Sequence, residues 1–234
     1  MQTGEIKTKA VVTRAVPYKE SDMIVTLVSV EYGKLTATAR GCLKPKAKLR
    51  YAAAPMNFGD YVLSGRNGRY VITDCSQIEA FLPVTYDLEK YYAGILTLEV
   101  LQKLSEEPQP QLFVHAIETL NDLAYSDKDT DTVVTHFLLK TLECNGNALD
   151  FAHCNVCKCD IEEEAYFKDA DGIVCKHCKG LSAIPIDAIS RAYLCGERTQ
   201  LPHELKVKAN ILLADFVYNM LGVRIGTHYF TEQI

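Results

Sequence analysis

The sequence predicts an α+β fold, with an N-terminal five-stranded β-barrel and a helical domain that carries a four-cysteine insertion. Residues 1–80 hold five short segments in which apolar and polar side chains alternate with the period of a strand. Beyond residue 83, apolar residues recur every three or four positions, which is the period of a helix. We therefore expect domains at 1–80 and 81–234, with the insertion at about 150–182.

The five expected strands lie at 6–12, 23–30, 34–40, 60–64 and 70–75. Asn67-Gly68 separates the last two and is a strong hairpin signal. The stretch from Cys42 to Asn57 is an excursion between the third and fourth strands, in which Leu49 to Ala54 are expected to form a short helix. Five strands with one such excursion predict an OB-like barrel, although an SH3-like barrel fits the periodicity almost as well.

Charge is distributed unevenly along the chain. Residues 1–80 carry 12 Lys and Arg against 7 Asp and Glu, a net charge of +5. The remaining residues carry 13 against 23, a net charge of −10. This asymmetry indicates a basic binding module on an acidic body, so the overall acidic charge does not exclude nucleic acid as a partner.

The most basic stretch runs from Lys34 to Arg50 and contains six cations and no acid. Its first part alternates as a strand with one cationic face, and a lysine run through Pro45 then predicts an exposed loop. Such a surface suits a phosphate backbone, and the alternative is a solvated charged face. The candidate DNA-binding residues are Arg14, Lys34, Arg40, Lys44, Lys46, Lys48, Arg50, Arg66 and Arg69. Tyr18 and Tyr51 interleave with these cations, and bases could stack on them if they are exposed.

The second half of the chain predicts helices joined by short loops, which favours antiparallel packing. A cap at Asp131 or Thr132 is expected for the third helix, and Gly146 suits the left-handed turn that ends it. The five expected helices cover 87–104, 112–125, 131–144, about 185–196 and 203–221.

Two CxxC pairs, Cys154 with Cys157 and Cys175 with Cys178, are separated by 17 residues. This spacing matches the zinc pattern in which two turns each supply two thiolates to one tetrahedral ion. Four protein ligands make such a site structural. Cys159, His153 and His177 are possible competing ligands, but the symmetric pairs are preferred.

Several classes of function lack their motifs. The helical context argues against a thioredoxin-like CxxC site, and there is no His-x-Glu for a zinc deaminase. The sequence has no P-loop and no GxSxG motif, so we do not expect an enzyme or a small-molecule substrate. No apolar run is long enough for a membrane span, and the N-terminus does not have the pattern of a signal peptide, so we expect the protein in the cytoplasm.

The N-terminal segment resembles that of the bacterial RecO recombination-mediator family. The matching features follow one another in the family's order: Arg14, Pro17-Tyr18, Glu20-Ser21-Asp22, Tyr32-Gly33-Lys34, Ala39-Arg40-Gly41 and then a basic loop. The helical middle and the four cysteines also follow the family's order, so the resemblance covers nearly the whole chain. The end of the chain, residues 222–234, is less basic than the family's usual ending, and no function of that ending is carried over.

The resemblance implies an OB-fold domain, a helical domain with a zinc-bearing insertion, and a role in recombinational repair by the RecFOR pathway. It implies that the protein binds single- and double-stranded DNA near the nucleoid, anneals complementary strands and associates with RecR. It also implies that the protein helps load RecA onto DNA coated by single-stranded-DNA-binding protein, with RecF as an indirect partner. The alternative is a zinc-stabilised protein–protein adaptor that does not bind DNA.

Overall fold

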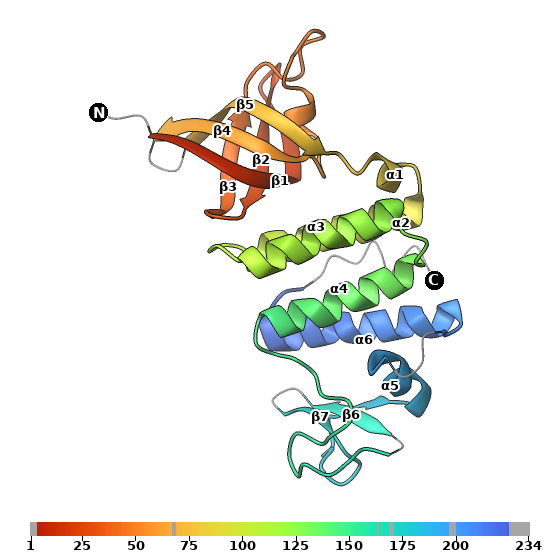
Figure 1. The fold of residues 1–234 in the computed structure, drawn as a ribbon. Helices are drawn as coiled ribbons and strands as arrows, with labels where there is room; N and C mark the ends of the chain where they lie inside the picture. Colours follow the sequence, from red (N-terminus) through yellow and green to blue (C-terminus); the bar gives the residue numbers. More distant parts are fainter. Residues whose placement is uncertain (1–3, 67–68, 163, 169–170, 197–199, 225–234) are drawn as a thin grey trace. The chain divides into compact units, whose positions relative to one another are not determined.

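The computed structural model describes residues 4–66, 69–162, 164–168, 171–196 and 200–224 (Figure 1). The chain divides into two compact units, Met1–Asp127 and Lys128–Ile234. The division expected at residues 80 and 81 falls within the first unit, and as a domain boundary it stays a prediction. No helix among the described residues is long and apolar enough to cross a membrane.

The first unit begins with a closed five-stranded barrel, as the alternating segments predict. Its strand order is β1-β2-β3-β5-β4, and β1 also pairs with β4. Among the described strands of the barrel, β3 and β5 pair in parallel and the other neighbours are antiparallel. The barrel confirms the OB-like expectation, since the chain makes its long excursion between β3 and β4. The strands are β1 (Gly4–Tyr18), β2 (Asp22–Ser29), β3 (Gly33–Ala39), β4 (Phe58–Arg66) and β5 (Arg69–Glu79).

The inward faces of the strands form the barrel core. Aliphatic side chains dominate it, and its members include Val12, Val25, Leu27, Ala37, Ala39, Leu63 and Ile72. Each fully buried Val, Leu or Ile side chain stabilises the folded barrel by about 1.5–3 kcal/mol. The predicted Asn67-Gly68 turn lies outside the described residues, but its flanking strands pair up to Arg66 and Arg69.

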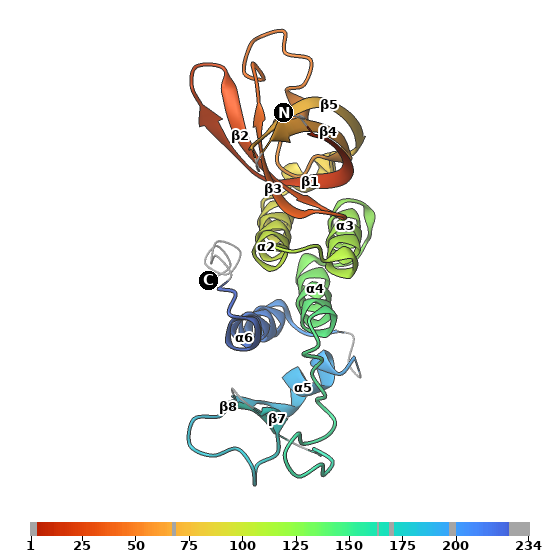
Figure 2. The same cartoon turned by 90° about the vertical axis from the view of Figure 1, so that its left-hand side faces the viewer.

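Three helices complete the first unit: α1 (Leu82–Thr85), α2 (Leu88–Leu104) and α3 (Pro110–Tyr125). Asp87 caps α2 by accepting a hydrogen bond from the backbone N–H of Lys90 at 3.0 Å. Pro110 stands in the first turn of α3, where its missing N–H leaves no bond unmade. Figure 2 shows α2 and α3 side by side, and both helices pack on α1.

The second unit contains α4 (Thr130–Cys144), a small sheet, α5 (Ala188–Leu194) and α6 (His203–Leu221). The start and end of α6 agree with the prediction, and Gly146 has the expected positive φ, +75°. The sheet was not predicted; its order is β7-β6-β8, with strands β6 (Ala165–Lys168), β7 (Gly172–Val174) and β8 (Ile184–Ile186).

Helix α3 begins at Pro110, two residues before the expected start at Leu112. Two further predicted helix starts were wrong. Asp129 caps α4, by accepting from the backbone N–H of Thr132 at 3.1 Å, so neither Asp131 nor Thr132 is the cap. The helix expected from Pro185 begins later, because Ile184–Ile186 pairs with β6 and Asp187 caps α5. In both cases an aspartate that can accept backbone N–H bonds fixes the first turn.

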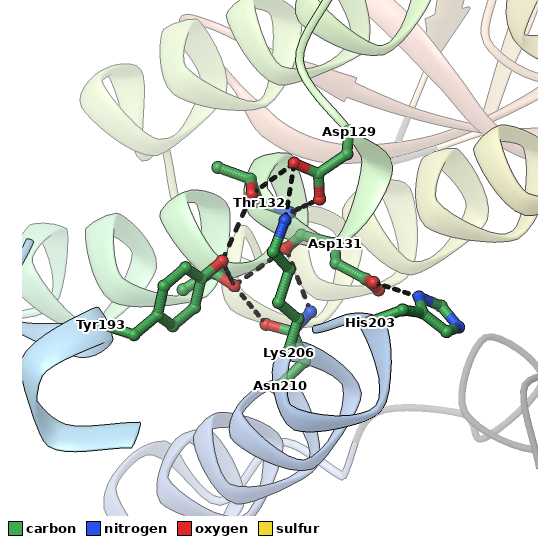
Figure 3. Close-up of polar contacts among 8 residues, drawn as sticks. Asp129, Asp131, Thr132, Tyr193, His203, Lys206 and Asn210 are labelled. Carbon is green, nitrogen blue, oxygen red and sulfur yellow. Dashed lines mark hydrogen bonds and ion pairs between the residues drawn. The ribbon is translucent and has the colours of Figure 1, made fainter. Parts of the chain in front are cut away.

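A buried polar network joins the three helices of the second unit (Figure 3). The hydroxyl of Thr135 on α4 donates to Asn210 Oδ1 at 2.7 Å and lies 3.0 Å from the hydroxyl of Tyr193 on α5. Asn210 on α6 in turn donates to the carbonyl of Asp131 at 3.1 Å. Since buried polar groups are costly when unpaired, this network fixes one arrangement of α4, α5 and α6.

Candidate nucleic-acid interface and metal centre

The third strand carries the predicted cationic face. Ala37 and Ala39 are buried, whereas Thr36 and Arg40 are exposed, so the outward face leads directly into the excursion after β3. Figures 1 and 2 show that this excursion projects from the barrel on the side away from α2 and α3.

The cations of this excursion are available for binding. Arg40, Lys44, Lys46 and Lys48 are all exposed. Over the described ranges, none of the four makes an ion pair or side-chain hydrogen bond. We call this segment, residues 40–50, the basic loop.

The basic loop is held by the turn that joins β1 to β2. The carboxylate of Asp22 accepts a hydrogen bond from the backbone N–H of Gly41 at 2.7 Å. The carbonyl of Ser21 accepts one from the N–H of Leu43 at 3.0 Å. Gly41 has a φ of +64°, which an L side chain rarely adopts. The accepted hydrogen bond accounts for the aspartate at position 22, and the positive φ accounts for the glycine at position 41.

Arg50 closes the basic loop. Its guanidinium donates to the carbonyls of Cys42 at 3.4 Å and Leu43 at 3.1 Å, so the side chain ties the end of the loop to its start. Arg50 is nevertheless exposed and still contributes its charge to the surface.

The base of the basic loop rests on a polar cluster in the barrel. The short 3₁₀ helix Tyr51–Ala53 follows the loop, inside the segment where a short helix was predicted. The hydroxyl of Tyr51 donates to the carbonyl of Cys75 at 2.5 Å, and that of Tyr61 donates to the carbonyl of Ala52 at 3.1 Å. Burial raises the pKa of Tyr61 well above its ordinary value, so this hydroxyl keeps its proton and remains a donor.

Lys34 lies at the opposite end of β3 from Arg40. Its side chain forms an ion pair with Glu106, and its backbone N–H donates to the carbonyl of Ser105 at 2.6 Å. A Cβ on the preceding Gly33 would lie 2.8 Å from that same carbonyl, which explains the glycine. Lys34 is therefore partly neutralised and is the weakest of the candidate phosphate contacts on this strand.

The remaining candidate cations are Arg69, Arg66 and Arg14. Arg69 is exposed at the start of β5, and the pairing of Tyr70 with Ala37 places it beside the cationic strand. The side chain of Arg66 lies outside the described residues. Arg14 is exposed on β1 and lines a cavity of about 400 Å³ against α2, so it belongs to a different part of the unit.

Two tyrosines border the basic loop, and both are partly exposed. Tyr18 is 42% exposed at the end of β1, and Tyr51 is 36% exposed although its hydroxyl is fixed. Lys19 was not among the predicted residues; its Nζ lies 5.2 Å from the centre of the Tyr18 ring. Its place in a short turn between two strands was the sequence signal for its exposure.

The four predicted cysteines come together in the second unit. The sulfur atoms of Cys154, Cys157, Cys175 and Cys178 all lie within 4.8 Å of one another. The sulfurs of Cys157 and Cys175 are 3.7 Å apart, close to the edge of about 3.8 Å expected for a tetrahedron with Zn–S bonds of 2.3 Å. The cluster has the donor set and spacing to hold a metal ion.

Backbone N–H groups favour the thiolate form of one cysteine in this cluster. Burial raises the pKa of Cys154, but N–H groups of Cys157, Cys175 and Val156 outweigh it and lower that pKa to about 6. A hydrogen bond with the Cys157 thiol raises the pKa of Cys178 to about 12. Before a metal binds, the cluster therefore holds some of its protons, and binding must release them.

The alternative histidine ligand His153 faces carboxylates instead of the cluster. Its Nδ1 lies 2.8 Å from Asp150, and its Nε2 lies 3.5 Å from Asp160. His177 is exposed and is not one of the four clustered residues. Cys159 lies outside the four but close to them, with its sulfur 3.3 Å from that of Cys157.

Most of the chain matches a known protein family. The family model described as Recombination protein O N terminal matches residues 1–81, and that described as Recombination protein O C terminal matches residues 85–195. DNA repair protein RecO of Myxococcus xanthus (strain DK1622) is 31% identical over 235 aligned positions, which cover 96% of each chain.

Two further relatives are also named DNA repair protein RecO. The protein from Clostridium novyi (strain NT) is 26% identical over 95% of this chain and 89% of its own length. The protein from Desulforamulus reducens (strain ATCC BAA-1160 / DSM 100696 / MI-1) is 28% identical over 97% and 94%. With both halves of the family pattern present in order on an OB-like barrel and a helical unit with four clustered cysteines, the chain belongs to the RecO family of DNA repair proteins.

Proposed function

We propose that this protein is a non-enzymatic recombination mediator that binds and anneals single-stranded DNA. With RecR, it helps load RecA onto DNA coated by single-stranded-DNA-binding protein. Double-stranded DNA and RecF complete the set of partners, RecF and RecA being indirect ones, and the site of action is the nucleoid within the cytoplasm. Membership of a DNA repair family and the chemistry of the basic loop support this proposal.

One observation carries the DNA-binding part of the proposal. Arg40, Lys44, Lys46 and Lys48 are exposed on a loop anchored by backbone hydrogen bonds, and the described structure gives them no acidic partner. When unpaired cations of a protein contact phosphates, they displace the counterions that are condensed on the nucleic acid. The release of these counterions drives binding without sequence preference. Arg50 and Arg69 extend this surface, and Lys34, Arg14 and Arg66 are secondary candidates.

Annealing follows from the same surface without a catalytic group. Two single strands repel each other through their phosphates, and a cationic loop lowers this repulsion when it holds both strands. Bases on a strand held by its backbone remain free to pair. Tyr18 and Tyr51 offer aromatic faces beside the loop, on which a base can stack before it pairs.

We propose that the four clustered cysteines hold one structural zinc ion. Four protein thiolates leave no coordination position for a substrate, and zinc would supply a crosslink between the two CxxC turns. The turns connect to the sheet of the second unit, because the N–H of Asn155 donates to the carbonyl of Ile173 on β7 at 2.8 Å. The zinc therefore stabilises the fold of residues 150–182 and takes no part in DNA chemistry.

Fluorescence anisotropy of a labelled single-stranded oligonucleotide, measured as a function of salt, tests the proposal. We expect the logarithm of the binding constant to fall linearly with the logarithm of salt concentration. A slope of about −3 corresponds to four phosphates on a single strand. Strand annealing should then be measured with the same protein. A weak, flat response would refute direct DNA binding and favour the protein–protein adaptor.

A further inference from the structure

The region of the four-cysteine cluster contains a fifth thiol. The sulfur of Cys159 lies 3.3 Å from that of Cys157, closer than the 3.7 Å that separates Cys157 from Cys175. Both Cys157 and Cys159 are exposed, whereas Cys154 and Cys175 are buried. The two exposed thiols therefore stand together at the open side of the cluster.

The backbone brings Cys159 back toward the cluster. Lys158 has a φ of +60°, a left-handed conformation that reverses the chain just after the CxxC turn. The N–H of Lys158 donates to the carbonyl of Cys154, and the N–H of Cys154 donates to the carbonyl of Cys159, each at 2.9 Å. These two hydrogen bonds hold the backbone of Cys159 beside the CxxC turn, so that only its side chain has to move to reach the cluster.

There is open space beside Cys159. A cavity of about 310 Å³ is lined by Cys159 and Cys175, with acidic side chains and His177 around it. The Cys159 side chain can therefore change its orientation beside the cluster without displacing buried side chains.

We propose that Cys159 is an alternate ligand of the metal centre and exchanges with Cys157. This inference rests on the proposed zinc site. In the exchange, the Cys159 thiolate forms a bond to the ion as the bond from Cys157 breaks. One proton leaves Cys159 and one is taken up by Cys157, so the charge around the ion is unchanged. Cys154, Cys175 and Cys178 remain bound throughout.

The first experiment uses the unmodified chain loaded with zinc and treated with iodoacetamide. If Cys157 and Cys159 share one coordination position, one label per chain enters this pair and is distributed over both residues in peptide mass spectra. The first label traps the other cysteine on the ion. Labelling of Cys159 alone, with Cys157 fully protected, would overturn the proposal.

The second experiment counts thiolates with Co²⁺ in place of zinc. We expect Cys157→Ser to retain one ion and a four-thiolate absorption spectrum, as should Cys159→Ser and the control Cys144→Ser. The double variant Cys157→Ser with Cys159→Ser should show three thiolates. It should bind the ion at least about tenfold more weakly, because losing a ligand costs no less than losing an outer-shell partner.

Two results contradict the exchange. A three-thiolate spectrum for Cys157→Ser alone, equal to that of the double variant, would mean that Cys159 does not replace Cys157. A spectrum with one nitrogen ligand would give that place to a histidine. If the unmodified chain binds neither zinc nor Co²⁺, the proposed metal site itself fails, and this result is distinct from the other two.

Discussion

Removing two cations from the basic loop should weaken DNA binding by an amount that the structure allows us to estimate. We consider Arg40→Ala and Lys44→Ala together, because both side chains are exposed and neither has a described partner. Each phosphate contact on a single strand contributes about 0.7 to the salt slope. The double variant should therefore have a slope less steep by about 1.4.

The same relation gives the loss of affinity. At 0.1 M salt, a slope change of about 1.4 corresponds to roughly 25-fold weaker binding, or about 2 kcal/mol, if binding near 1 M salt is unchanged. Fluorescence anisotropy at several salt concentrations measures both quantities.

A matched control removes the same charge elsewhere on the barrel. Lys7 and Lys9 lie on β1, where they pair with Glu5 at 3.5 Å and Asp60 at 2.9 Å. Changing both lysines to alanine should alter the affinity for DNA much less, because lysines that are already paired with carboxylates displace few counterions from DNA. If the basic-loop variant keeps the parent's affinity and slope, or if the control loses as much, the basic loop is not the site.

Three further predictions concern stacking, acid and the metal. Tyr18→Ala should lower affinity for single strands by about 1–3 kcal/mol and leave the salt slope unchanged, since a ring stacks on a base without neutralising a phosphate; an altered slope would contradict this in the same anisotropy assay. Burial raises the pKa of the Asp129 carboxyl, but its bonds with Lys206 and Thr132 outweigh burial and hold that pKa below the ordinary value of 3.8. The carboxylate therefore stabilises the folded protein above pH 3.8, and this stabilisation is lost as the pH falls through the pKa that Asp129 has in the folded protein. Denaturant unfolding between pH 2 and 5 should therefore show a weaker pH dependence for Asp129→Asn, and an unchanged dependence would refute the assignment. Stripping the metal with a chelator should expose residues 150–182 to proteases. DNA affinity should stay unchanged, because the candidate phosphate contacts all lie in the first unit; loss of DNA binding on stripping would show that residues 150–182 take part.

The strands and most of the helices could be predicted because their patterns are long and regular. The alternation from Lys34 to Arg40 reports one buried face, and the barrel keeps that face inside. The apolar pattern of residues 203–221 predicted where α6 begins and ends. In the structure, Gly222 adopts a left-handed turn just after Leu221 and terminates the helix. The cysteine spacing placed four sulfurs together because CxxC turns are local structures.

The small sheet of the second unit could not be predicted in the same way. Its strands are three or four residues long, so a period of two has no length over which to appear. Ile184–Ile186 pairs with a strand about 20 residues earlier, and that long-range pairing overrides the local preference that suggested a helix from Pro185. Two neighbouring aspartates could cap α4, and the sequence could not show that the carboxylate of Asp131 instead contacts His203, 72 residues away.

The roles of individual cations also depended on tertiary contacts. Lys34 and Arg40 have the same position in the alternation, but only Lys34 meets an acid, Glu106, which is 72 residues away in sequence. Arg50 has the charge of a phosphate ligand, but it also holds the loop through two carbonyls. The sequence predicts a set of surface cations but cannot rank them, because contacts with distant parts of the chain decide which of them are already paired.

Lysine footprinting tests the central claim most directly. The protein is treated with a lysine-acetylating reagent with and without a single-stranded oligonucleotide, and acetylation of each lysine is measured by mass spectrometry. We expect DNA to protect Lys44, Lys46 and Lys48, while the exposed Lys128 and Lys208 of the second unit react as before. Unchanged reactivity of the three basic-loop lysines in the presence of bound DNA, with protection elsewhere, would contradict the account.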